Sequence, residues 1–116
     1  MIVDDTHINS KLTNGKDVAD NGGTLLASIA WKKQIEGQTL ATADGFTPDQ
    51  RFFVGMAQWA CENEGPENER VSAITNPHSP GFACMNGVVS NMPKFQKAFD
   101  CKSGQPMVHT STCRVW

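Results

Sequence analysis

The chain has 116 residues, 39% of them hydrophobic and 19% charged, and a net charge of −2. These values fit one small globular domain. No basic face points to nucleic-acid binding, and the longest apolar run is only a few residues, too short to cross a membrane. The first ten residues carry neither the basic nor the apolar part of a signal peptide, so the sequence itself assigns no cellular location.

The first predicted helix runs from about Gly15 to Gln34, because apolar residues recur there near helical spacing. Asp17 and Asp20 lie on one side of its first turns, where carboxylates suit the positive end of the helix dipole. Lys16 lies in the same turns and does not suit that end. The glycine pair at 22–23 predicts close packing of another backbone, since glycine inside a helix costs about 1 kcal/mol relative to alanine.

The second predicted helix has the clearest start signal in the chain. Thr47 is its N-cap, Pro48 takes the first helical position, and Gln50 completes a capping box. An apolar stripe at helical spacing follows and is predicted to face the core. It comprises Phe52, Phe53, Met56, Trp59 and Ala60.

Two further helices complete the predicted fold. The third begins at Pro66 and directs Val71 and Ile74 inward. The fourth runs from about Pro93 to Phe99. Its apolar face comprises Met92, Phe95 and Phe99. The connecting stretches, at 36–46, 76–91 and 100–116, read as long ordered loops. The predicted fold class is therefore mainly α, with about four helices.

The chain has four cysteines, Cys61, Cys84, Cys101 and Cys113, and no two of them form a C-x-x-C pair. This spacing speaks against a zinc ribbon. An even number permits two disulfides in an oxidising compartment, with three possible connectivities. Four unpaired thiols fit the spacing equally well.

Four segments of the chain together carry a family resemblance. They are HINSKLTNGKDVADNGG (7–23), FTPDQRFFVGMAQWAC (46–61), NPHSPGFACMNGVVSNMPKFQKAFDC (76–101) and CRVW (113–116). In this order they resemble the C-terminal part of the neprilysin-like zinc metallopeptidases. The resemblance implies that residues 1–116 are the C-terminal part of a peptidase domain, without its upstream H-E-x-x-H helix. The strand-like opening IVDD agrees with a chain that begins inside a larger fold.

The resemblance also implies a zinc site in the parent family. Such peptidases hold zinc with the two histidines of H-E-x-x-H and with a glutamate from a second helix, and the motif's own glutamate activates the attacking water. This chain contains only His7, His78 and His109, and no H-E-x-x-H. No cofactor is therefore expected for this chain alone.

The second family helix begins with a pattern like G-E-N-x-A-D-x-G-G, whose glutamate is the third zinc ligand. In GKDVADNGG, that position is Lys16. Lysine is not a usual zinc ligand. Asp17 lies about 100° around the helix and cannot replace it. Asp20 matches the family aspartate that orients a metal-bound histidine, so in this chain it would orient nothing that the chain supplies. Its alternative role is that of a helix-dipole or capping carboxylate.

This chain also differs from the family at positions that bind substrate or lie near the catalytic histidine. His78 matches a histidine that stabilises the oxyanion, and its plain alternative is a hydrogen-bonded loop histidine. Cys84 stands where the family has an arginine that grips the substrate, and a thiol cannot replace that guanidinium fork. Asn76 stands where an aspartate is common. With Lys16, these changes predict a catalytically inactive copy. His7 and His109 are predicted to be polar surface residues.

Three functional hypotheses remain open from the sequence. In the first, the chain is a piece of a metallopeptidase that a separate chain with H-E-x-x-H completes; in the second, it is a non-catalytic binding module. A third is a rebuilt metal or hydrolytic site from His78, Cys84 and nearby acids, with cysteine as nucleophile and histidine as base. The missing upstream part would cover apolar helix surface, so self-association or a protein partner is expected to cover it here.

The resemblance bears on the cysteines and on location as well. By this resemblance, Cys61, Cys101 and Cys113 match family cysteines whose disulfide partners lie upstream. Cys84 matches no family cysteine, so a new pairing with Cys84 stays open. Family members are mostly extracytoplasmic, while this chain shows no signal peptide.

Overall fold

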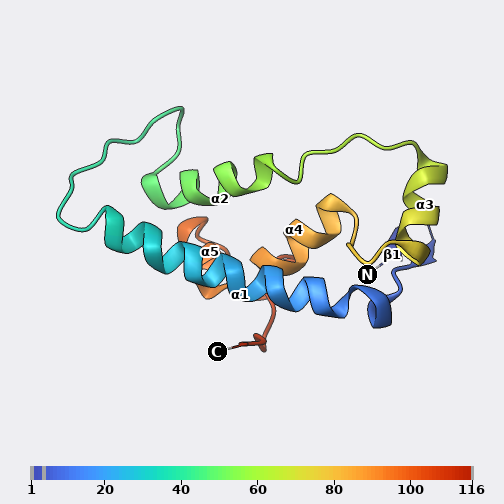
Figure 1. Cartoon of the computed structure of the whole chain (residues 1–116). Coiled ribbons are helices and arrows are strands. Elements are labelled where there is room, and N and C mark those ends of the chain that lie inside the picture. The colour runs from blue at the N-terminus through green and yellow to red at the C-terminus, as the bar shows by residue number, and fades with distance from the viewer. Residues whose placement is uncertain (1, 4, 116) are drawn as a thin grey trace.

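The computed structural model describes residues 2–3 and 5–115 and is mainly helical (Figure 1). Its elements, in chain order, are β1 (Ile2–Val3), β2 (Thr6–His7), α1 (Ser10–Gln34), α2 (Pro48–Gln58), α3 (Pro66–Thr75), α4 (Gly81–Ser90) and α5 (Pro93–Ala98). The two strands form an antiparallel hairpin in which Val3 pairs with Thr6. The predicted mainly α class is confirmed, with five helices in the described residues rather than four.

The long helix α1 begins at Ser10, earlier than the sequence predicts. Its N-cap residue, Asn9, makes no side-chain capping bond, so no local signal marked this start. Instead, the backbone N–H of Asn9 donates to the carbonyl of Ala73 at 3.0 Å, and this contact with α3 fixes the first turn. No acidic residue lies in that turn. The predicted helix-dipole role of Asp20 is therefore wrong, because Asp20 lies in the interior of the helix.

Helix α4 lies in a stretch that the sequence predicts as irregular, and that prediction is wrong. The glycines at positions 81 and 87 make the stretch read as a loop. Packing decides otherwise, because a helix that is apolar around most of its circumference is stabilised by burial on several sides. The buried residues of α4 are Gly81, Ala83, Cys84, Met85, Val88, Val89 and Ser90. In Figure 1, α4 lies between α1 and α2.

The hydrophobic core forms where α2, α4 and α5 meet. Its buried residues are Phe53, Met85, Val88, Val89 and Met92. The ring of Phe53 packs edge-on against two others, with centroids 5.1 Å from Phe52 and 5.3 Å from Phe95. Such edge-to-face pairs stabilise a core beyond their buried area. The predicted apolar face of α5 is confirmed, because Phe95 and Phe99 pack on this core beside the buried Met92.

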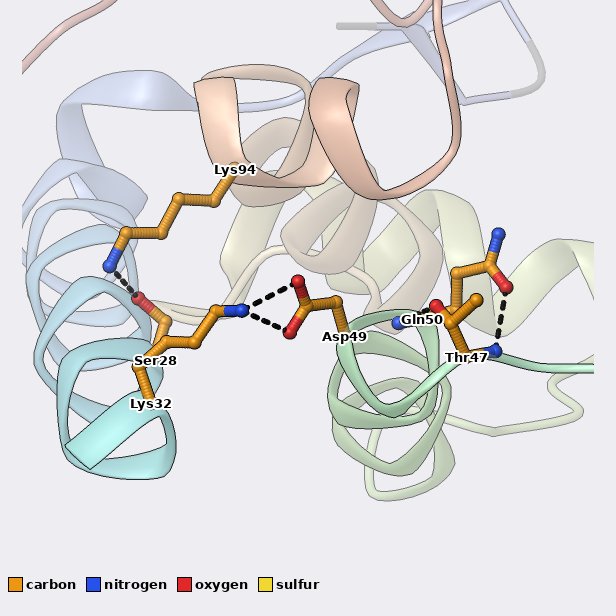
Figure 2. Close-up of polar contacts among 6 residues, drawn as sticks. All are labelled: Ser28, Lys32, Thr47, Asp49, Gln50 and Lys94. Atoms are coloured by element: carbon orange, nitrogen blue, oxygen red, sulfur yellow. Dashed lines mark hydrogen bonds and ion pairs between the residues drawn. The ribbon is translucent and has the colours of Figure 1, made fainter. Parts of the chain in front are cut away.

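The predicted capping box at the start of α2 is also confirmed (Figure 2). Thr47 Oγ1 accepts from the backbone N–H of Gln50 at 3.3 Å, and Gln50 Oε1 accepts from the backbone N–H of Thr47 at 2.9 Å. The Gln50 amide also donates to the carbonyl of Ala98 at 3.0 Å. The cap thus joins the start of α2 to the end of α5.

Three apolar residues that were predicted to face inward are exposed instead. The exposed fractions are 64% for Trp59, 60% for Val71 and 52% for Ile74. Trp59 caps the C-terminal end of α2, beyond its packed turns. Helix α3 packs on the β1–β2 hairpin rather than on the main core, and its buried position is the small residue Ala73, at 0%.

The chain leaves more surface uncovered than a self-contained domain of its size. It exposes 7809 Å², whereas a monomer of 12.6 kDa is expected to expose about 6200 Å². Its radius of gyration is 15.4 Å, against about 13.4 Å for a compact domain of this length. The exposed large apolar residues include Leu26, Ile29, Trp59, Val71, Ile74 and Phe82. Among the described helices, none combines the length and the apolar character needed to cross a membrane.

The segment after α5 is held in place by side-chain amides of the helices. Asn91 Nδ2 donates to the carbonyl of Cys113 at 2.7 Å, and the backbone N–H of Cys113 donates to Asn91 Oδ1 at 2.7 Å. Asn21 Nδ2 adds a longer bond, 3.4 Å, to the same carbonyl. The Asn91 amide therefore pairs with residue 113 as a peptide group of a neighbouring strand would.

Candidate functional site

The candidate site lies where α1 faces α4 and the loop before it. Lys16 is exposed on α1, as expected of a solvated side chain, while Asp17 and Asp20 are half-buried. The exposed ammonium group therefore belongs to a residue one position before Asp17 and four positions before Asp20. The acidic side of this helix is turned toward α4, and the lysine is turned toward solvent.

The carboxylate of Asp17 is held by two hydroxyl groups. Thr13 Oγ1 donates to Asp17 Oδ2 at 2.8 Å, and Ser79 Oγ donates to Asp17 Oδ1 at 2.9 Å. Thr13 is 1% exposed and lies one turn before Asp17 on α1. Both oxygens of this carboxylate are thus engaged within the protein. Sequence reasoning missed Thr13 and Ser79, although their hydroxyls lie at helical spacing and within the NPHSP segment, respectively.

The carboxylate of Asp20 accepts a hydrogen bond from the thiol of Cys84, with 3.0 Å between Sγ and Oδ2. The expectation that Asp20 orients nothing supplied by this chain is therefore wrong. Burial, the hydrogen bond to Asp20 and the negative charges of Asp20, Asp17 and Glu62 together raise the pKa of the Cys84 thiol from 9.0 to about 12, and burial is the largest cause. Cys84 is consequently a protonated donor and a poor nucleophile.

His78 lies apart from this carboxylate–thiol pair in its contacts. It is exposed, its backbone N–H donates to Asn76 Oδ1 at 2.9 Å, and its Nδ1 lies 3.3 Å from the same oxygen. Asn76 therefore fixes the loop locally, as in an Asx-turn. No hydrogen bond within residues 2–3 and 5–115 joins His78 to Cys84, so the structure does not assemble the cysteine–histidine pair that a rebuilt hydrolytic site would need.

An open cavity of about 570 Å³ borders the site. Its lining includes His7, Thr13, Asp17, Ser79, Cys84 and His109. Both of these histidines are exposed, as predicted, and His109 Nε2 also lies 3.0 Å from the hydroxyl oxygen of Ser90. The structure thus brings Asp17 and Cys84 together with His7 and His109 around one hollow. Of the residues described as lining it, none is His78 or Lys16.

The residues present do not fit a zinc ion held by this chain. In the part of the chain that the structure describes, no three histidine, cysteine or acidic side chains are placed to hold a metal. Lys16 is exposed, and the carboxylates of Asp17 and Asp20 are engaged by hydroxyl and thiol donors. Zinc needs three convergent protein ligands at about 2.0–2.3 Å.

All four cysteines have free thiols in the structure. Cys61 and Cys113 are exposed, Cys101 is half-buried, and Cys84 is buried. The pairing of Cys84 with another cysteine is thus not formed. The exposed thiols of Cys61 and Cys113 provide a reference for the reactivity of the buried Cys84 thiol.

Cys84 is expected to resist thiol reagents in the folded chain. A rise in its pKa from 9.0 to about 12 lowers the thiolate fraction near pH 8 about a thousandfold. An aromatic disulfide reagent at pH 8 should therefore modify Cys61 and Cys113 quickly and Cys84 only after unfolding, as peptide mapping would measure. Equal rates at Cys84 and Cys61 would contradict the bond to Asp20.

The same shift predicts a dependence of stability on pH. The folded state keeps the thiol protonated up to about pH 12, while the unfolded thiol ionises near 9.0. The unfolded state therefore binds fewer protons between these values, and the free energy of unfolding should fall as the pH rises above 9.0. Urea unfolding at pH 8 and pH 10 should show a smaller fall for Cys84→Ala than for the unaltered chain.

Comparisons with known proteins relate nearly the whole chain to one protein family. The family model of peptidase family M13 matches residues 2–115. Neprilysin-1 of Caenorhabditis elegans is 44% identical over 117 residues, which cover 97% of this chain and 16% of that protein. Endothelin-converting enzyme 1 of Mus musculus is 40% identical over 113 residues, which cover 94% of this chain and 15% of that protein. The chain thus spans about a sixth of the length of these curated relatives.

Solved structures give the same result. The Mycobacterium tuberculosis zinc metalloprotease ZMP1, in complex with an inhibitor, matches with a TM-score of 0.87 and 29% identity over 97% of this chain and 18% of that chain. A chain of the Haemonchus galactose containing glycoprotein complex matches with a TM-score of 0.78 and 32% identity, covering 89% of this chain and 19% of that one. The likeness in both cases extends over nearly all of the described residues.

Proposed function

Because the chain belongs to peptidase family M13, the neprilysin-like zinc metallopeptidases, we propose that it is the C-terminal part of such a peptidase domain and does not hydrolyse peptide bonds by itself. The family's general base and two of its zinc ligands belong to H-E-x-x-H, which the 116 residues do not contain. The remaining ligand position is Lys16.

Lys16 is the observation that carries this proposal. Its side chain is exposed to solvent, and a lysine ammonium group has three donors and no lone pair to offer a metal. An ammonium group also repels a divalent cation, so the substitution does more than remove one ligand. Asp17 and Asp20 lie nearby, but their oxygens accept hydrogen bonds from Thr13 and Cys84, among others.

Other working positions support the same conclusion. At Cys84, a buried thiol that donates to Asp20 stands in place of the family arginine. It carries no positive charge for a substrate carbonyl. His78 keeps the position of the oxyanion histidine, and Asp20 that of the aspartate which orients a metal ligand. In this chain alone, we propose that both are inherited positions without catalytic use.

The test is zinc retention by the purified chain. After exchange into metal-free buffer and addition of one equivalent of Zn²⁺, we expect nearly no zinc to remain bound, as measured by elemental mass spectrometry. One zinc retained per chain, or per dimer, would overturn the proposal and would direct mutagenesis to His78, Cys84, Asp17 and Asp20.

A mixing experiment isolates the contribution of Lys16. The chain is combined with the part of a 44%-identical relative that precedes this region and carries H-E-x-x-H. We expect Lys16→Glu to restore zinc retention in the mixture, and the unaltered chain to leave it at least about tenfold lower, because a third ligand is missing. Lys11→Glu makes the same change of charge at another exposed position of α1 and should restore nothing. Equal retention with Lys16 unaltered would refute the proposal.

A second candidate function is that of an interaction module, and the uncovered surface favours it. The chain exposes about a quarter more surface than a monomer of its mass, 7809 Å² against about 6200 Å². The difference exceeds the roughly 800 Å² that each partner buries in a typical stable interface. Sedimentation at increasing protein concentration tests self-association: a dimer would support it, whereas a monomer at all concentrations would exclude it.

A further inference from the structure

The elements of the structure form two groups, each of which packs mainly within itself. Helices α1, α2, α4 and α5 pack together around the hydrophobic core, whereas α3 packs on β1 and β2. In Figure 1, α3 and β1 lie together at one end of the molecule, beside the start of α1. We call β1, β2 and α3 the hairpin unit. It has little apolar packing of its own, because among its described residues α3 buries only the small side chain of Ala73.

Asn9 holds the hairpin unit against the start of α1 through two hydrogen bonds. Its backbone N–H donates to the carbonyl of Ala73 at 3.0 Å, and its Nδ2 donates to the carbonyl of Ile74 at 3.4 Å. The second bond is exposed to solvent. Such bonds contribute only modestly to stability, because water offers the same groups alternative partners. Breaking these two bonds releases the end of α3 from α1.

The two chain segments that connect α3 to the core are each tied down at the end away from α3. Before α3, the Glu62 carboxylate accepts a hydrogen bond from the backbone N–H of Gly81, the first residue of α4. After α3, Ser79 Oγ donates to Asp17 Oδ1 of α1 at 2.9 Å. Residues 63–65 and 77–78 lie between these ties and α3, and all of them are exposed. Helix α3 can therefore leave the core by changes of φ and ψ in these short segments, while both ties stay formed.

The hairpin unit also borders the open cavity of about 570 Å³ at the candidate site. His7 of β2 and the following Ile8 line this cavity together with Thr13 and Asp17 of α1 and Cys84 of α4. We propose that the hairpin unit is a gate of this cavity, which detaches and unfolds locally while α1, α2, α4 and α5 stay folded. Such a local opening requires less free energy than global unfolding, because the core contacts are kept. This inference does not depend on the peptidase ancestry of the chain.

The test is native-state hydrogen exchange at low urea concentrations, followed residue by residue by NMR. The amides of Asn9 and Asn76 report on the gate, because their N–H groups donate to carbonyls of α3, and a detached helix of 10 residues does not persist in water. The amide of Met92 reports on the core, because it donates to a carbonyl of α4 at 3.0 Å. We expect Asn9 and Asn76 to share one opening equilibrium and to open at least about tenfold more often than Met92. Their exchange should also depend less on urea, since the gate exposes less surface than global unfolding does.

Two matched alanine-to-glycine variants complete the test. Ala27→Gly weakens the middle of α1 and should speed the exchange of Met92 about fivefold. It should leave Asn9 and Asn76 unchanged, because α1 is folded whether the gate is closed or open. Ala73→Gly weakens α3 and should speed all three amides, because α3 is lost both in the open gate and in global unfolding. Exchange of Asn9 or Asn76 as slow as that of Met92, separate openings of Asn9 and Asn76, or equal acceleration of all three amides by Ala27→Gly would each overturn the proposal.

Discussion

Replacing Phe53 with alanine is expected to lower the free energy of unfolding by about 3–5 kcal/mol, the usual cost of removing a buried ring. Phe53 is 5% exposed, and its ring contacts those of Phe52, Phe95 and Phe99. These rings come from both α2 and α5, so the cavity would loosen the contact between the two helices. Few neighbours are free to collapse into it, because the surrounding rings hold one another.

The measurement is urea unfolding followed by circular dichroism. Since domains of this kind are stable by about 5–15 kcal/mol, Phe53→Leu provides a milder variant if the alanine variant is unfolded in buffer. Phe46→Ala is the matched control, because Phe46 is 37% exposed in the loop before α2. It should cost less than about 1 kcal/mol. Similar losses at Phe46 and Phe53 would show that the core does not centre on Phe53.

Gly81→Ala is expected to destabilise the chain by about 1–3 kcal/mol or more, because the added Cβ has no room. It would collide with the carbonyl oxygen of Ala60 and lie 2.7 Å from Glu62 Oε1. The Glu62 carboxylate also accepts from the backbone N–H of Gly81. The methyl group would therefore push apart the segment that joins α2 to α3 and the first residue of α4, and a backbone oxygen cannot rotate away as a side chain does.

Gly23→Ala is the control for this prediction. A Cβ at Gly23 would meet nothing within 4 Å, so the helix propensity of alanine should raise the free energy of unfolding by up to about 1 kcal/mol. Thermal and urea unfolding of both variants would show opposite signs. A neutral Gly81→Ala would contradict the close approach of α4 to this segment. The prediction of close packing at the glycine pair is wrong for Gly23, whereas Gly22 is buried.

The helix starts that the sequence predicted well are those with a local chemical signal. Prolines 48, 66 and 93 each occupy the first position of a helix, and their fixed φ and missing N–H suit that position. The capping box of Thr47 and Gln50 is equally local, since its two partners lie three residues apart. Such signals do not depend on the rest of the fold.

The features that the sequence did not reveal depend on distant contacts. Helix α4 carries turn-forming glycines and is stabilised by burial of Met85, Val88 and Val89 against other helices. The bond from Cys84 to Asp20 joins residues 64 positions apart. Family alignment marked each of these two positions by itself, but neither spacing nor composition could place them in contact, nor indicate the raised pKa of the thiol.

The side-chain amide of Asn91 forms hydrogen bonds only with the backbone of residue 113. These two hydrogen bonds therefore do not depend on the side chain of residue 113. They do depend on Asn91, because its side-chain amide provides both the donor and the acceptor. Natural variation at 113 should leave the path of the terminal segment unchanged. The exposed thiol of Cys113 is thus attached to a backbone segment that Asn91 holds in place. A covalent probe on this thiol would report on the fold through its distance to α1.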